Sequence, residues 1–269
     1  MRIDTWFKSD IGRVRRSNQD TVGCFPELAL FVVADGMGGR AQGEVASRMA
    51  VETFRELLEN TPVAGNDAQP KDSTFWRSLL GRRSQGESAG DLAVLRSTAE
   101  AANRKIFEAG RRSAEISEVA APSMGTTVVA LRCDLVRRQA SWVHVGDSRL
   151  YRMRGGQLRL MTADHTVFGE AFRQQSEVPT DLRHTNQLVQ ALGIDLRVEV
   201  AGSSAALEPD DLFLLCSDGI SGMVPATTIL ADLSRPVTLA ERGQLLLQHA
   251  LDAGGRDNAS LLLVHVLDP

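Results

Sequence analysis

Three aspartates stand at the ends of apolar segments that have the composition of buried strands. Asp35 directly follows the apolar run 31–34, and Asp218 follows the run 212–217. Asp257 lies just before the last apolar run of the chain. One such aspartate is usually a turn former, but carboxylates that meet at a sheet edge repel one another unless a cation balances them. The pattern therefore predicts a divalent-cation site.

The residue types indicate what such a site would do. Carboxylate oxygens favour hard ions such as Mg²⁺ or Mn²⁺, and two ions about 3.5–4 Å apart can activate a water and neutralise a phosphoryl group. Gly36 permits a close backbone approach, so its carbonyl is a further candidate ligand. Arg13, Arg15 and Arg16 carry guanidinium groups that can grip two phosphate oxygens at once. For at least two of these arginines, a solvated basic turn is a sufficient explanation.

The elements that must position these residues alternate between strand-like and helical patterns. Apolar residues at helical spacing predict an amphipathic helix from Gly43 to about Asn60, and another from Asp91, a candidate N-cap, to about Arg112. Thr238-x-x-Glu241 is a capping box that opens a third helix, which stops before Gly254-Gly255. The predicted strands are Ile3–Phe7, Thr21–Phe25, Leu28–Ala34, Thr126–Arg132, Gln139–Val145, Arg149–Arg154, Leu158–Met161, Arg197–Ala201, Leu212–Cys216 and Ser260–Val266. This order predicts an α+β fold of antiparallel sheets covered by helices.

Length and composition limit the function classes. The 269 residues carry a net charge of −4, so no basic field is available for nucleic acid or an anionic membrane. The three cysteines are far apart, and no apolar run is long enough to cross a bilayer or to form a signal peptide. We therefore expect one cytoplasmic domain over 1–269, with a flexible insertion at 61–90 and no nucleic-acid or membrane partner.

Seven segments resemble, in order and spacing, the motifs of the bacterial type 2C metal-dependent protein serine/threonine phosphatases. The resemblance covers nearly the whole chain and implies a four-layer α-β-β-α sandwich, in which helix pairs flank two antiparallel sheets. It also implies that the polar stretch 165–190 is a flap beside the active site. The matching segments are Asp10–Asp20, Val33–Gly39, Gly43–Ser47, Met124–Thr127, His144–Tyr151, Leu215–Gly219 and Asp257-Asn258.

The resemblance also implies roles for individual residues. Asp35 would bridge two Mn²⁺ or Mg²⁺ ions, the Gly36 carbonyl would bind one of them, and Asp218 and Asp257 would hold the other. Arg15 falls where the family binds phosphate, and these side chains together form the catalytic set. Three residues would support the ligands from behind, and they are Gln19, Asp20 and Asn258. The segment Gly146–Arg149 is expected to be structural support.

The implied reaction is direct attack of metal-activated water on phosphoserine or phosphothreonine, without a phosphoenzyme. The implied partners are phosphorylated proteins, among them the targets of a bacterial serine/threonine kinase that this enzyme opposes as a monomer. Three departures from the family pattern are visible. Gln19 stands where glutamate is usual, Arg40 stands where histidine is common, and the segment 119–123 has no acid, Glu118 being the nearest. The last departure puts a third metal ion in doubt.

Other interpretations fit less of the sequence. The segment 36–41 matches the pattern G-x-G-x-x-A, but Asp35 would point a carboxylate at a pyrophosphate and hairpins follow instead of βαβ units. No cysteine is followed six positions later by arginine, which excludes a cysteine-dependent phosphatase. A weakly active, phosphoprotein-binding module is the remaining alternative, motivated by Gln19 and the missing acid. Retention of the full aspartate set favours catalysis.

Overall fold

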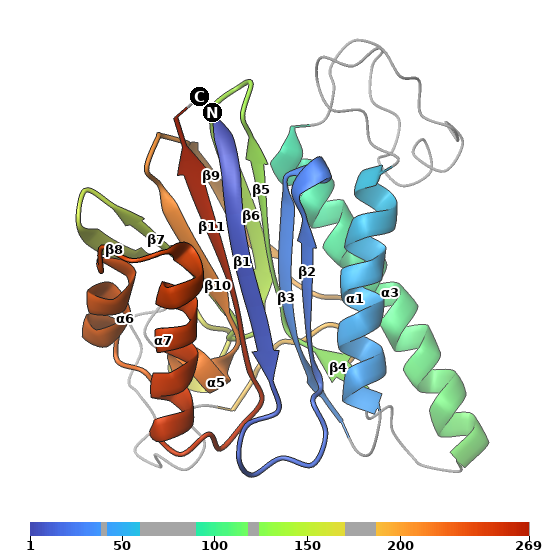
Figure 1. Cartoon of the computed structure of the whole chain (residues 1–269). Coiled ribbons are helices and arrows are strands. Elements are labelled where there is room, and N and C mark those ends of the chain that lie inside the picture. The colour runs from blue at the N-terminus through green and yellow to red at the C-terminus, as the bar shows by residue number, and fades with distance from the viewer. Residues whose placement is uncertain (39–41, 60–89, 118–123, 170–186, 269) are drawn as a thin grey trace, which may run out of the picture.

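Two antiparallel sheets pack face to face, and helices cover both outer faces (Figure 1). The computed structural model describes residues 1–38, 42–59, 90–117, 124–169 and 187–268. The predicted insertion at 61–90 apart from Gly90, most of the predicted flap at 165–190, Arg40, Glu118 and the segment 119–123 therefore lie outside the described residues. No helix in the described ranges combines the length and apolar composition needed to cross a membrane.

The first sheet joins the two ends of the chain. Its strand order is β1-β11-β10-β7-β8, and β1 pairs with β11 along the whole length of both strands. The amino and carboxyl ends therefore lie side by side (Figure 1). Its strands are β1 (Arg2–Asp10), β7 (Arg149–Arg154), β8 (Gln157–Leu160), β10 (Leu212–Cys216) and β11 (Ala259–Leu267).

The second sheet carries the other half of the core. Its order is β2-β3-β5-β6-β9, with the short β4 paired to β3. Apolar side chains from both sheets, such as Phe31, Leu131, Phe213 and Leu262, fill the space between them. The strands are β2 (Asp20–Phe25), β3 (Leu30–Met37), β4 (Gly125–Thr126), β5 (Val128–Asp134), β6 (Gln139–Val145) and β9 (Ala201–Ala206).

Helices close the two outer layers. On the second sheet, α1 (Gln42–Glu59) and α3 (Asp91–Ser117) bury an apolar stripe that includes Phe54, Leu95 and Ile106. On the first sheet, α6 (Ala226–Leu233) and α7 (Leu239–Asp252) bury Ile229 and Leu246, beside the one-turn α5 (Asp218–Ser221). The predicted capping box of α7 is present, with Thr238 and Glu241 bonded to each other's backbone N–H. The four-layer α+β fold is thus confirmed.

Several predicted boundaries are wrong. The strand expected at Arg197–Ala201 lies later, as β9, because pairing with β6 begins only at Ala201, opposite His144. The carbonyl of Val200, just before the strand, accepts a hydrogen bond from the Arg96 side chain. The strand expected from Leu28 starts at Leu30, after a 3-10 turn at Pro26–Leu28. Asp91 is the first residue of α3 instead of its cap, since the Gly90 carbonyl accepts the first helical hydrogen bonds. That helix continues to Ser117, beyond the predicted Arg112.

Candidate metal centre and active site

One pocket of about 500 Å³ collects the predicted site residues at one end of the two sheets. Its walls come from the loop after β1, the end of β3, the turns after β6 and β10, and the turn before β11. All of the predicted catalytic, ligand and supporting residues line it except Asp20, which is buried behind it. The lining residues are Arg15, Gln19, Asp35, Gly36, Met37, Gly38, Thr127, Asp147, Gln187, Leu188, Asp218, Asp257 and Asn258.

Asp35 lies near the end of β3 and is fixed by its backbone. Its N–H donates to Thr127 Oγ1 at 3.0 Å, and its carbonyl accepts from Thr127 N at 2.8 Å and from Thr126 Oγ1 at 2.9 Å. Burial, followed by repulsion from Asp20 and Asp218, raises the pKa of Asp35 well above its usual range. The Asp35 backbone is therefore firmly placed, and its buried carboxylate is repelled by its acidic neighbours.

The residues behind Asp35 are equally constrained. Asp20 pairs with it across β2 and β3, and accepts a hydrogen bond from Ser217 Oγ at 2.8 Å. Burial raises the pKa of Asp20 to about 6. At Gly36, a Cβ atom would lie 2.1 Å from the Gly43 carbonyl oxygen and 2.5 Å from the Gln19 carbonyl oxygen, so no other residue fits there without movement. The backbone around the Gly36 carbonyl is thus packed between β2 and α1.

Asp218 and Asp257 approach from the other sheet. Burial, followed by repulsion from Asp257, raises the pKa of Asp218. Asp257 instead has a neighbour of opposite charge, because Arg15 Nη2 lies 2.6 Å from its Oδ2. The Arg15 and Asp257 side chains are 53% and 34% exposed, so this pair faces the open pocket and can be exchanged for another ligand.

Asn258 organises the loop that carries Arg15. Its Nδ2 donates to the carbonyls of Ile11 and Ser17, at 2.9 and 3.0 Å, and its Oδ1 accepts from Gln19 N at 2.9 Å. Both ends of the loop 11–19 are therefore held by one side chain next to Asp257. This is the geometry expected of a residue that supports the site from behind.

The site has features that fit divalent cations. Among the described residues, Asp218 Oδ1 and Asp20 Oδ1 are buried without a hydrogen-bond partner, which is costly for a carboxylate unless a cation is bound nearby. Within the same ranges, no three His, Cys, Asp or Glu side chains are grouped so as to hold an ion unaided. Backbone oxygen and water would complete the coordination, as is usual for Mg²⁺. The donor set of carboxylates and a carbonyl suits Mn²⁺ or Mg²⁺.

Sequence reasoning missed Asp147 as a pocket residue. It follows β6 at the sheet edge, and burial, with repulsion from Asp218, raises its pKa to about 7. The neighbouring residues are structural: Ser148 Oγ hydrogen bonds to Thr127 Oγ1 at 2.7 Å, and Arg149 pairs with Asp164 at 2.6 Å. Part of the signal was available, since Asp147 lies two residues after the last residue of β6, but its nearness to Asp218 depends on the pairing of β7 with β10.

Comparison with known proteins agrees with this geometry. The family model described as protein phosphatase 2C matches residues 13–254, and the chain belongs to that family of metal-dependent protein phosphatases. The serine/threonine phosphatase Stp of Listeria monocytogenes is 32% identical over 264 residues, which cover 96% of this chain and 94% of Stp.

Two solved structures share the architecture. The Mycobacterium tuberculosis serine/threonine phosphatase PstP superimposes with a TM-score of 0.78 at 29% identity, and the match covers 100% of both chains. A second structure, the PstP catalytic domain in complex with two manganese ions, gives a TM-score of 0.76 at 29% identity and covers 99% of each chain. The protein thus has the fold of a two-metal protein phosphatase.

Proposed function

We propose that this protein hydrolyses phosphoserine and phosphothreonine in proteins, using two Mn²⁺ or Mg²⁺ ions held in the pocket described above. The observation that carries the proposal is the meeting of Asp35, Asp218 and Asp257 around Arg15 in that pocket. Each carboxylate comes from the region of a different strand end, and Asp218 Oδ1 is buried with no hydrogen-bond partner within the described part of the chain. The named relatives support the choice of phosphoserine and phosphothreonine.

The ligand roles are those that the family resemblance implies, and the positions of the residues are compatible with them. Asp35 has Asp20 and Asp218 as acidic neighbours and would serve both ions, and the Gly36 carbonyl would serve one of them. Asp218 and Asp257 would hold the other ion. When bound, the ions lower the pKa of a coordinated water and neutralise charge on the phosphoryl group. The backbone that carries Asp35 is already fixed by hydrogen bonds to Thr126 and Thr127.

Arg15 binds the substrate in this proposal. Its guanidinium group now pairs with Asp257, a contact that would weaken once cations share that carboxylate. The freed fork would hold two phosphate oxygens and orient the phosphoryl group for attack in line with the leaving hydroxyl. Asn258 keeps the Arg15 loop in place, and Asp20 holds the strand end beside Asp35.

The departures from the family pattern change details, not the reaction. Gln19 Nε2 lies 3.4 Å from the Gly38 carbonyl, and a neutral amide there would hold a coordinated water less strongly than glutamate would. A binding module with little activity is not favoured, since it would have no need for a complete set of ligands around Arg15. We therefore propose an active enzyme with two ions.

The cellular role follows from the reaction class. We propose a single catalytic domain over 1–269 that works as a monomer in the cytoplasm and opposes a serine/threonine kinase. One chain supplies every proposed ligand and Arg15, and the three cysteines are unpaired, both of which are consistent with this setting.

The direct test is hydrolysis of p-nitrophenyl phosphate and a phosphothreonine peptide, with and without Mn²⁺. Asp35→Asn should lower kcat/KM by at least about a thousandfold, because both ions lose their shared ligand. Asp252→Asn, an exposed aspartate on α7, is the matched control and should retain wild-type activity. Metal-independent turnover, or full activity in Asp35→Asn, would sink the proposal.

A further inference from the structure

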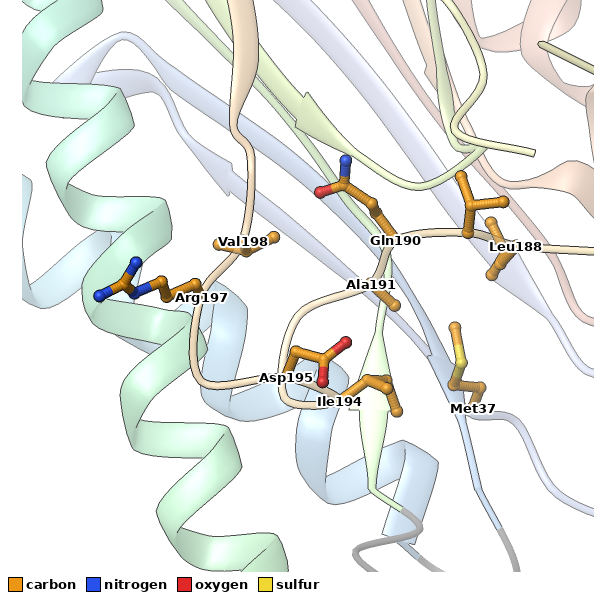
Figure 2. Close-up of a pocket in the computed structure, with 9 residues that line it drawn as sticks. Met37, Leu188, Gln190, Ala191, Ile194, Asp195, Arg197 and Val198 are labelled. Carbon is orange, nitrogen blue, oxygen red and sulfur yellow. The ribbon is translucent and has the colours of Figure 1, made fainter. Parts of the chain in front are cut away.

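A second hollow of about 190 Å³ adjoins the catalytic pocket (Figure 2). Met37 and Leu188 line both spaces, so the two are continuous at these side chains. Met37 ends β3, two residues after Asp35, while Leu188 pairs with Thr166 across an isolated bridge. When the phosphorylated residue of a peptide occupies the catalytic pocket, the side chain of a residue nearby in that peptide can therefore reach this hollow.

The wall of the hollow is held in shape before any substrate binds. Asn103, buried on α3, accepts from Gly193 N at 2.7 Å and donates to the carbonyls of Asp195 and Leu196 at 3.0 and 3.2 Å. Gln190 Oε1 accepts from Glu199 N at 2.9 Å, which closes the loop between them.

The same wall is connected to the catalytic strand. Leu192 exchanges two backbone hydrogen bonds with Thr126, and Thr126 Oγ1 donates to the Asp35 carbonyl at 2.9 Å. The loop that forms the hollow is thus fixed to the backbone that carries the proposed bridging carboxylate. A ligand that binds here would lose little free energy to ordering of the protein.

The chemistry of the hollow is mixed. Its walls are apolar, and one carboxylate, that of Asp195, points toward the space beside Ile194 and Ala191 (Figure 2). Arg197, the basic residue of the lining, points away toward α3. Among the described residues, no hydrogen bond or ion pair is recorded for the Asp195 carboxylate. The apolar walls are formed by Met37, Leu188, Ala191, Ile194 and Val198.

We propose that this hollow is a substrate-specificity subsite for an arginine or lysine that lies within about two residues of the phosphorylated residue. The inference rests on the proposed function. A long basic side chain offers an aliphatic stem to the apolar walls and a cation to Asp195. Consecutive residues of an extended peptide are about 3.3–3.6 Å apart, so adjoining spaces accept residues close in sequence. A purely aliphatic side chain would fill the walls but leave the carboxylate unpaired.

The test compares phosphothreonine peptides that carry arginine, methionine or alanine in turn at each of the two positions on either side. Each kcat/KM is divided by that for p-nitrophenyl phosphate with the same variant, so that catalytic defects cancel. At one position, wild type should prefer arginine over methionine by about two- to fivefold, the range of a partly exposed ion pair. Methionine should exceed alanine by a further factor of about ten from apolar contact.

Three variants separate the contributions. Asp195→Asn should make the arginine and methionine peptides equivalent, whereas Ile194→Ala should slow both relative to the alanine peptide. Glu199→Gln removes a charge from the same loop outside the hollow and should keep the full arginine preference. Equal use of arginine and methionine by wild type, or a preference that survives in Asp195→Asn, would overturn the proposal. Wild-type turnover of p-nitrophenyl phosphate shows in either case whether the metal site itself works.

Discussion

Strand β10 has an aspartate at each end, and the surroundings of the two carboxylates differ in charge and in hydrogen bonding. Before the strand, Asp211 is fully buried and pairs with Arg154 through two hydrogen bonds, of 2.5 Å from Nε and 2.6 Å from Nη2. After the strand, Asp218 keeps a buried oxygen without a partner among the described residues, and neighbouring carboxylates surround it.

The difference separates a carboxylate that stabilises the fold, Asp211, from one that is available to bind a metal ion, Asp218. A buried carboxylate is tolerated when a cation and hydrogen bonds satisfy it, as they do at Asp211, whose Oδ2 also accepts from Glu208 N at 2.9 Å. At the other end of the strand, Arg15 is the one positive side chain among the described residues that line the pocket, and it pairs with Asp257. The unsatisfied end is therefore the one prepared for external cations.

Asp218→Asn should abolish the function of the unsatisfied end of β10. Loss of a proposed ligand should lower kcat/KM for a phosphothreonine peptide by at least about a thousandfold. In chelator the same variant should melt at a temperature equal to or higher than wild type, because the substitution removes a buried negative charge next to Asp257 and Asp35. Peptide hydrolysis and thermal unfolding check the two effects. A variant that is inactive because it is destabilised without metal would contradict this account.

Asp211→Asn should lower the stability of the protein and leave its activity intact. The substitution removes the buried negative charge that pairs with Arg154 Nε and Nη2, while Glu208 still pairs with Nη1. We expect the free energy of unfolding to fall by about 2–4 kcal/mol, since Arg154 is partly exposed and keeps one acidic partner. The kcat/KM of the folded fraction should stay within about twofold of wild type. Urea unfolding measures the first effect. Asp210→Asn is the matched control, because the Asp210 carboxylate, next to Asp211 in the sequence, is 90% exposed. This variant should change the free energy of unfolding by less than about 0.5 kcal/mol.

The sequence predicts one of these two ends of β10 and not the other. Asp218 was found from sequence because an acid after an apolar run is visible in one dimension. The Arg154–Asp211 pair joins β7 to β10 and depends on register, in which Met153 lies opposite Leu212, so no local pattern reveals it. The same limit applies to Asp147, which is near Asp218 because β7 pairs with β10, with Arg149 opposite Cys216.

Strand boundaries show the same division between local and tertiary causes. The bounds of β6, β7 and β10 were predicted correctly from apolar composition. Strand β9, with the sequence AGSSAA, has little intrinsic strand preference, and its pairing with β6 imposes the conformation. Helix α6 was not predicted because Pro225 at its start provides no side-chain cap.

A smaller expected effect is that the stabilisation by bound metal depends on pH. Burial raises the pKa of Asp20 to about 6 and that of Asp147 to about 7, above the value near 3.8 of the unfolded chain. Folding therefore favours the protonated forms, and the metal-free protein should lose stability as pH rises from about 4 to 7. Bound Mn²⁺ compensates the ionised carboxylates. The difference in melting temperature between Mn²⁺ and chelator should therefore grow between pH 5.5 and 8, and a difference independent of pH would contradict the assignment.

Calorimetric titration with Mn²⁺ tests the central claim most directly, because it measures the ions themselves without turnover. The account predicts that wild type binds two ions in the pocket, that Asp218→Asn loses at least one of them, and that Asp211→Asn retains both. Equal binding by wild type and Asp218→Asn would show that the unsatisfied end of β10 is not the metal site, and would contradict the account.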